Sequence, residues 1–167
     1  MHKVYLLLGG NLGNVPLTFK SVTHALQEKA GPVVQTSRLY LSEPWGLEAP
    51  EDFLNQALEM QTRLSPPALM QVALDIEKEF GRNRSQEVLA SRTIDIDVLL
   101  FDQLVLSLPG LEIPHPRLHL RRFALEPLAE IAPGCLHPVM MKSIAALLEE
   151  CNDPLWVKPF GKPTIRL

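Results

Sequence analysis

The spacing of apolar and polar residues along the chain predicts six main segments of regular structure. Runs rich in Val, Ile, Leu and aromatic residues predict strands, and apolar residues three and four apart predict helices. In chain order we expect a strand at 3–8, a helix at 16–30, strands at 33–42 and 53–64, a helix capped by Ser65 that ends near Gly81, and a strand within 92–102. This β-α-β-β-α-β order is typical of helices packed on one face of an antiparallel sheet.

The segment after the sixth element is expected to extend this core. Residues 104–108, "LVLSL", are predicted to pair with the preceding strand as a hairpin around Asp102-Gln103. The tail at 117–150 is predicted to be mostly helical, with Ser143 as a helix N-cap. Neither a repeat nor a linker divides the sequence, so we expect one domain over 1–167.

Composition narrows the class of protein. Hydrophobic residues make up 46% of the 167 positions, which favours a folded core over disorder. The formal net charge of -3 provides no global basic field for nucleic acid, and no apolar run reaches the ~20 residues that span a bilayer. The opening "MHKVYLLLGG" is predicted to be a first strand rather than a signal peptide. Cys135 and Cys151 form no CxxC pair, which favours a reducing, cytoplasmic location.

Two aspartates interrupt the apolar strand near residue 96. Because side chains alternate along a strand, Asp95 and Asp97 share one face, while Ile94, Ile96 and Val98 share the other. Two carboxylates ~5 Å apart repel by about 3 kcal/mol at an effective dielectric constant of ~20. A shared proton, basic neighbours or a hard cation such as Mg²⁺ could each offset this repulsion.

Arginines surround this pair in the sequence. Arg82, Arg84 and Arg92 precede the aspartates, and Arg121 and Arg122 follow them. One interpretation is a solvated polar strand face that pairs with these arginines. The other is phosphoryl transfer, in which carboxylates hold metal ions and guanidinium groups bind phosphate oxygens.

Several motifs together identify a family resemblance. The stretches "LGGNLGN", "SEPWG", "DFLNQAL", "IEKEFGRNR", "RTIDIDVLLFD" and "IPHPRLHLRRF" occur in the order and spacing of the 6-hydroxymethyl-7,8-dihydropterin pyrophosphokinase family. The chain resembles this family over nearly its whole length, least beyond residue 130. The resemblance implies a ferredoxin-like α+β fold, and transfer of pyrophosphate from ATP to the hydroxymethyl oxygen of the pterin, with release of AMP, in folate biosynthesis.

The resemblance also implies roles for individual residues. The two aspartates would hold two Mg²⁺ ions, and two loop arginines, Arg82 and Arg92, would clamp the phosphates during catalysis. The implied ATP contacts are Arg84, Val98, His115 and Arg121. The implied pterin contacts are Asn11, Ser42, Trp45, Phe53, Asn55 and Phe123. Glu77, expected on a helix surface, would support neighbouring residues. We expect small-molecule substrates only, no nucleic acid or membrane partner, and a monomer.

Two departures from the family pattern concern the pterin side, while Gly110, Glu112 and the doubled arginine Arg121-Arg122 leave open which residues meet ATP. Just before the signature the sequence has Val-Leu-Ala-Ser-Arg at 88–92, where the usual form is Arg-Trp-Gly-Pro-Arg. Phe53 stands where Tyr is usual, which removes a hydroxyl group.

Two other classes of function stay open at this stage. A ferredoxin-like fold can serve as a nucleic-acid-binding module, although the negative net charge and the lack of paired strand aromatics argue against it. A metal-dependent phosphoesterase could use the same aspartate pair without a pterin.

Overall fold

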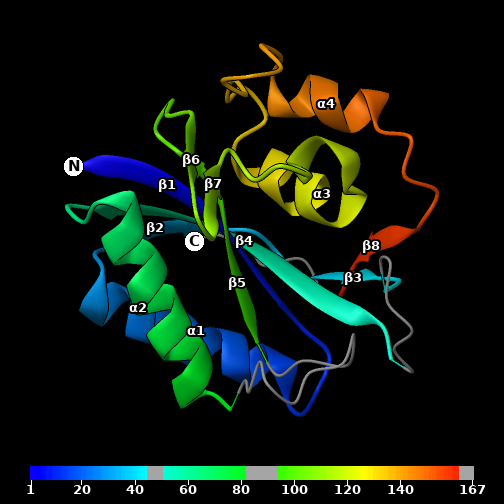
Figure 1. Ribbon diagram of the computed structural model, residues 1–167. Helices are drawn as coiled ribbons and strands as arrows, with labels where there is room; N and C mark the ends of the chain where they lie inside the picture. Colours follow the sequence, from blue (N-terminus) through cyan, green and yellow to red (C-terminus); the bar gives the residue numbers. More distant parts are fainter. Residues whose placement is uncertain (45–50, 82–93, 162–167) are drawn as a thin grey trace.

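The computed structural model describes residues 1–44, 51–81 and 94–161. Figure 1 shows a central sheet with helices on both sides. The elements are β1 (His2–Gly10), α1 (Val15–Lys29), β2 (Val33–Thr36), β3 (Tyr40–Ser42), β4 (Phe53–Thr62), α2 (Pro66–Glu79), β5 (Asp95–Phe101), β6 (Leu106–Leu108), β7 (Leu111–Ile113), the 3-10 helix η1 (Leu118–Leu120), α3 (Arg122–Ile131), α4 (Ile144–Glu150) and β8 (Val157–Pro159).

The main sheet has the strand order β5-β1-β4-β3-β8, and β2 also pairs with β4. The strand pairs of this sheet in the described part of the chain are antiparallel. The predicted strand at 33–42 is interrupted, because the backbone of Ser37 bonds to Ala57 while its hydroxyl accepts from the Ala57 N–H. When β2 and β3 are taken as one broken strand, the order of the four core strands is that of a ferredoxin-like fold, which confirms the predicted fold class.

The helices lie on both faces of the sheet, so the expectation of one covered face holds only for α1 and α2. Alternate strand residues on that face form one core cluster with α1 and α2, and the residues between them form a second cluster with α3 and α4. In β4 the first cluster takes Leu54, Leu58 and Met60, and the second takes Ala57, as the strand parity predicts.

The predicted hairpin between 104–108 and β5 is wrong. Leu106 instead lies opposite Ile113, in a separate two-stranded sheet of β6 and β7. Its turn contains Gly110 at φ 76°, a left-handed conformation that glycine adopts without steric cost. Asp102 cannot start a hairpin on β5 because its carboxylate and backbone N–H both bond to Lys3.

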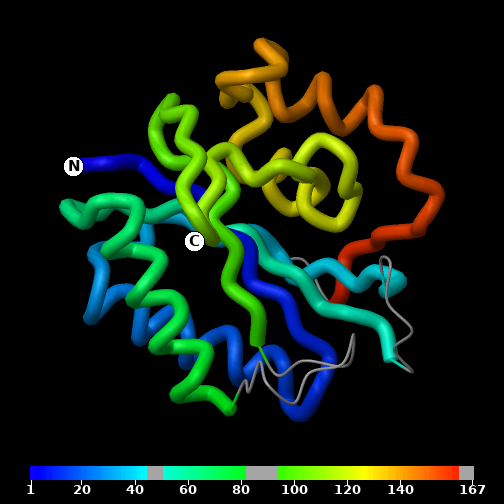
Figure 2. Tube along the Cα trace, in the orientation of Figure 1, coloured from blue at the N-terminus to red at the C-terminus, as the bar shows by residue number. Residues whose placement is uncertain are grey.

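Other local predictions are confirmed. The Ser65 and Ser143 hydroxyls cap α2 and α4 by accepting from the N–H groups of Ala68 and Ala146. The strand β8 was not predicted; Figure 2 shows this red C-terminal segment beside the cyan β3, with which it pairs. In the described part of the chain, each helix falls short of the length and apolar character needed to cross a membrane.

Candidate functional site

Three neighbouring strands bring the polar residues of the site into one row. Gly9 of β1 lies opposite Asp95 of β5 on one side and opposite Asn55 of β4 on the other. Directly opposed residues of antiparallel strands project to the same face. The carboxylate and the amide therefore flank a position without a side chain, with Cα atoms of Asp95 and Asn55 about 10 Å apart across two strand spacings.

The neighbouring row of opposed strand residues lies where the apolar packing of α3 on the sheet begins. Asp97, Leu7 and Ala57 lie opposite one another, and α3 packs on Leu7 and Ala57. Asp95 and Asp97 are both only partly buried. The end of the sheet where β5 begins lies away from α3 and α4 in Figure 1. The aspartates therefore stand at the edge of the second core cluster, with access to solvent.

Asn55 is held in a fixed orientation. Its side chain is buried, and its Nδ2 donates to the Ser42 hydroxyl at 2.7 Å. The NH₂ group of the amide is therefore engaged by a protein acceptor. The Oδ1 atom lies toward β1, since a Cβ added at Gly9 would be 3.6 Å from it. Phe53 is half-buried and shares this face, as the strand parity predicts.

Two further predicted pterin residues are at least partly buried. Asn11 follows β1, is buried, and donates from Nδ2 to the Glu51 carbonyl at 3.1 Å. Phe123, in the first turn of α3, is partly buried against the second core cluster. The guanidinium of Arg121 lies 5.5 Å from the centre of the Phe123 ring, a cation–π distance.

His115 is placed among charged groups of the site. Its backbone N–H donates to the Leu99 carbonyl at 2.9 Å, which fixes the segment after β7 against β5. Burial, and then the positive charge of Arg121, lower the pKa of His115 to about 4, against the opposing effect of Asp95. Arg121 and Asp95 thus act on His115 in opposite directions. His115 is neutral at pH 7; its Nδ1 accepts from the Arg117 N–H at 3.2 Å, so its Nε2–H can donate a hydrogen bond.

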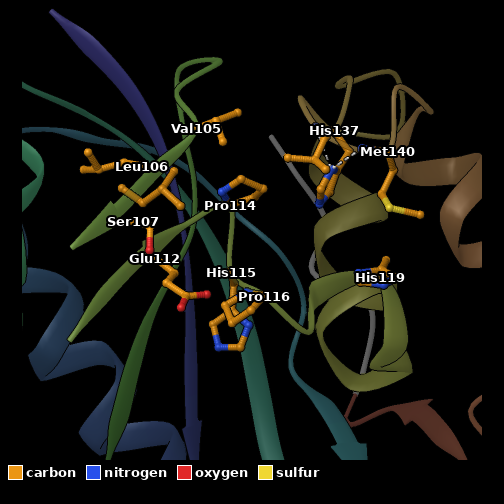
Figure 3. Close-up of a pocket in the computed structure, with 12 residues that line it drawn as sticks. Val105, Leu106, Ser107, Glu112, Pro114, His115, Pro116, His119, His137 and Met140 are labelled. Atoms are coloured by element: carbon orange, nitrogen blue, oxygen red, sulfur yellow. Dashed lines mark hydrogen bonds between the residues drawn. The ribbon is translucent and has the colours of Figure 1, made fainter. Parts of the chain in front are cut away.

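A cavity of about 230 Å³ lies beside this segment. Figure 3 shows His115 and Pro116 on one side of it and His137 with Met140 on the other. His137 is buried, and its Nδ1 accepts from the backbone N–H groups of Val139 and Met140. Since Nδ1 is an acceptor, we assign the proton of the neutral ring to Nε2. His137 thus holds the loop that lines one side of this cavity.

The adjacent arginines Arg121 and Arg122 make different contacts. Arg122 is tied to the C-terminal segment: its Nη2 donates to the Cys151 carbonyl at 2.9 Å, and its backbone N–H donates to Asp153. Arg121 instead acts electrostatically on His115 and lies beside Phe123. The structure therefore favours Arg121 as the arginine that faces the site.

A polar network links α3 to the sheet, and it was not predicted from the sequence. The Glu130 carboxylate accepts from the Tyr40 hydroxyl at 2.7 Å, and from the Arg38 Nε at 2.9 Å. Burial raises the pKa of Tyr40 to about 12, and Glu130 adds to the shift. Burial alone would raise the pKa of Glu130, but hydrogen bonds from Tyr40 and Arg38 lower it. Tyr40 lies opposite Asn55 in the sheet, so the network supports the amide's strand.

Two predicted residues lie apart from this group. Val98 is buried on the other face of β5, in the first core cluster. Glu77 was expected on a helix surface, but its side chain is buried and its Oε1 accepts from the Ile96 N–H at 2.9 Å. The expectation failed because Glu77 falls on the apolar stripe of α2, next to Ile76.

Four predicted residues cannot be placed. Trp45, Arg82, Arg84 and Arg92 lie outside the described residues. Gly9 was missed by the sequence reasoning, although the parity of β1 would have put it on the same face as Leu7.

The donor set fits a hard cation that binds together with its substrate. The described residues contain no group of three or more His, Cys, Asp or Glu side chains that could hold a metal. Mg²⁺ is commonly bound by one or two carboxylates, completing its coordination with water and phosphate oxygens. Asp95 and Asp97, on one partly open strand face, match that pattern.

Comparisons with known proteins give consistent matches over most of the chain. The family model described as 7,8-dihydro-6-hydroxymethylpterin-pyrophosphokinase (HPPK) matches residues 5–133. The 2-amino-4-hydroxy-6-hydroxymethyldihydropteridine pyrophosphokinase of Porphyromonas gingivalis is 38% identical over 138 residues, covering 81% of this chain and 93% of that protein. The enzyme of the same name from Aquifex aeolicus is 36% identical over 160 residues and covers 96% of both chains.

A solved structure shows the same fold. A crystal structure of wild-type Plasmodium falciparum HPPK-DHPS with pteroate aligns with a TM-score of 0.76 and 15% identity. The alignment covers 89% of this chain, which spans only 44% of that one. At this identity the likeness concerns the fold alone.

Proposed function

The chain belongs to the 7,8-dihydro-6-hydroxymethylpterin-pyrophosphokinase family of folate biosynthesis, and from this we propose its reaction in detail. The enzyme transfers the pyrophosphoryl group of ATP to the hydroxymethyl oxygen of 6-hydroxymethyl-7,8-dihydropterin. A bond forms between that oxygen and the β-phosphorus, the bond from the β-phosphorus to the bridging oxygen breaks, and AMP leaves with the electron pair. The hydroxyl proton is released.

The observation that carries this proposal is the row Asp95, Gly9 and Asn55. The carboxylate lies on one side of an empty position and the fixed amide on the other. A nucleotide phosphate bound on the Asp95 side and a flat heterocycle on the Asn55 side would meet above Gly9. Catalysis of phosphoryl transfer depends mainly on positioning and charge neutralisation, and this arrangement provides both.

The pterin side offers a shape suited to a flat, polar ring. Phe53 is partly buried on the face of the amide, Phe123 is partly buried against the second core cluster, and Asn55 presents its Oδ1 as an acceptor. An acceptor in a buried setting selects for ring N–H groups, because a ligand without them would leave the acceptor unpaired. The polar contacts at Ser42 and Asn11 keep this side in place.

The nucleotide side offers charge complementarity. Asp95 and Asp97 would hold Mg²⁺, which when bound neutralises phosphate charge and orients the transferring group. Arg121 supplies a guanidinium for phosphate oxygens, and neutral His115 supplies a hydrogen bond without adding charge. Arg82 and Arg92 remain proposed as phosphate clamps, and Arg84 as an ATP contact. A contact of ATP with Val98 would be with its backbone, because its side chain is buried in the first core cluster. A monomeric state and a cytoplasmic location remain predictions.

The other functional classes lose support. A nucleic-acid module would need an open sheet surface, but α3 packs on Leu7, Ala57 and Leu99. A phosphoesterase would need only the aspartates and a water molecule, and would leave the buried Asn55–Ser42 pair without a role. We therefore favour the two-substrate reaction.

The test is a product analysis with purified protein, ATP, Mg²⁺ and the reduced pterin. We expect AMP to form only when the pterin is present, together with the pyrophosphorylated pterin. Pterin-independent release of ADP or phosphate would contradict the proposal and indicate a phosphoesterase. A salt-sensitive shift with single-stranded RNA, without AMP formation, would favour the nucleic-acid module.

A further inference from the structure

Glu77 occupies a position where a charged side chain gives no packing advantage. It is 2% exposed on the buried stripe of α2, which otherwise consists of Leu69, Ala73 and Ile76. An apolar residue would fill this place without the free-energy cost of burying a carboxylate. The carboxylate is therefore expected to make a specific contact, and one is present at the adjacent strand.

That contact is with the backbone between the two aspartates. The Ile96 N–H donates to the Glu77 Oε1 at 2.9 Å. Figure 1 shows α2 beside β5, which is the outermost strand at this side of the sheet. Edge strands expose N–H groups that no strand pairs with. Glu77 thus supplies the acceptor that a further strand would otherwise provide.

The hydrogen bond acts on the opposite face through the backbone. The side chain of Ile96 is buried in the first core cluster, while Asp95 and Asp97 project to the open face. Fixing the Ile96 peptide fixes the Cα–Cβ directions of both neighbours, whose Cα atoms are about 7 Å apart in a strand. This bond therefore holds the start of β5 from the side opposite its pairing with β1.

We propose that Glu77 is a positioning residue for the metal site. Its carboxylate holds the Ile96 peptide so that Asp95 and Asp97 present their oxygens to Mg²⁺ at a fixed separation. Partners that orient metal ligands commonly affect metal affinity 10- to 100-fold. The inference rests on the proposed function, because it assumes that the aspartates bind Mg²⁺ with a nucleotide.

The test uses two substitutions of Glu77 and a matched control. Glu77→Leu keeps the packing but removes the acceptor, whereas Glu77→Gln keeps an oxygen that can accept from Ile96. The control is Thr62→Val at the far end of β4, where a fully buried hydroxyl donates to the Ala30 carbonyl at 2.6 Å. It removes this buried hydrogen bond, and the one that the hydroxyl accepts from the Leu64 N–H at 3.1 Å, both remote from the aspartates.

The main readout is Mg²⁺-dependent binding of a non-hydrolysable ATP analogue, measured by calorimetry. For Glu77→Leu we expect the Mg²⁺ concentration for half-maximal binding to rise about tenfold or more. For Glu77→Gln the change should stay within about threefold. Thr62→Val should lower the melting temperature and leave the Mg²⁺ requirement unchanged.

The second readout is hydrogen exchange at the Ile96 amide, which should accelerate in Glu77→Leu and remain slow in Glu77→Gln. If Glu77→Leu does not fold, the result for Glu77→Gln decides. Hydrogen exchange at Ile96 and a Mg²⁺ dependence like those of the parent support the proposal. A tenfold loss of Mg²⁺ affinity with unchanged exchange at Ile96 overturns it. An unchanged Mg²⁺ requirement in folded Glu77→Leu also overturns it. A parent that binds the Mg²⁺-analogue complex but forms no pterin-dependent AMP would refute the proposed function separately.

Discussion

The two faces of β5 differ in what covers them. Ile96 and Val98 project toward α1 and α2 and are 3% and 4% exposed. Asp95 and Asp97, from the same strand end, project to the opposite face and are only partly buried. Leu99, further along, is 1% exposed and packs in the cluster with α3. The covered face is thus continuous, whereas the other face is covered by α3 over only part of its length.

This difference separates stability from chemistry within one sheet. A substitution on the face of α1 and α2 disturbs close packing, so it should change the free energy of unfolding. A substitution in the row Asp95, Gly9 and Asn55 alters an open surface, so it should mainly change the reaction. Except at Glu77, whose carboxylate accepts from the Ile96 N–H, the two faces should respond to substitution independently.

The largest expected effect is on the open face, at Asp97. Asp97→Asn keeps the side-chain shape and removes one negative charge. Without metal, the free energy of unfolding of the variant should therefore equal that of the parent or exceed it by up to about 1 kcal/mol. AMP formation should fall by about 10²- to 10³-fold, because a metal ligand is lost. Melting curves with and without a Mg²⁺-nucleotide analogue should show stabilisation in the parent and much less in the variant.

The opposite pattern would contradict this view of Asp97. If the carboxylate mainly anchors an arginine, Asp97→Asn should destabilise the metal-free protein and retain most of the activity. Melting and AMP release measured on the same samples distinguish the two results.

The next largest effect is expected on the covered face. Leu58 of β4 is fully buried in the first core cluster, three residues from Asn55 along the chain. Leu58→Ala should lower the free energy of unfolding by about 2–5 kcal/mol, from lost burial and a residual cavity. Activity per folded molecule should stay within about threefold of the parent. Denaturant unfolding and AMP release at low temperature test both expectations; a selective loss of activity would show that the faces are coupled.

A smaller effect is expected at Gly9. A Cβ there would lie 3.6 Å from the Asn55 Oδ1, an ordinary contact, so Gly9→Ala should fold normally. The added methyl group would nevertheless stand where the reacting groups are proposed to meet, and turnover should fall about 10- to 100-fold. Gly134→Ala, whose Cβ would meet no atom within 4 Å, is the matched control and should keep full activity. Equal turnover in both variants would show that the reaction does not occur above Gly9.

Much of the fold follows from local patterns in the sequence. Strand parity in β4 and the serine caps of α2 and α4 depend on neighbours within a few residues, and all were predicted correctly. The hairpin after β5 was not, because the Asp102 carboxylate bonds to Lys3, about a hundred residues away. The pair Asp95 and Asp97 could be found from i, i+2 spacing. Its supports at Glu77 and Gly9 could not, since helix packing and strand register decide them.

The smallest expected effect concerns the pH dependence of stability at His115. Its pKa is about 4 in the folded protein, against an ordinary value of 6.5. Between these values the unfolded chain takes up a proton at this residue and the folded protein does not, so stability falls as the pH decreases from 6.5 to 4. His115→Asn removes this contribution, and His137, whose pKa is also lowered, affects parent and variant alike. Because solvent reaches part of the ring, we expect the parent to lose only about 1–2 kcal/mol more than the variant across this window. Denaturant unfolding of both proteins at half-unit pH intervals measures the difference; parallel curves would mean that His115 titrates normally, and that the site does not hold it in the neutral form.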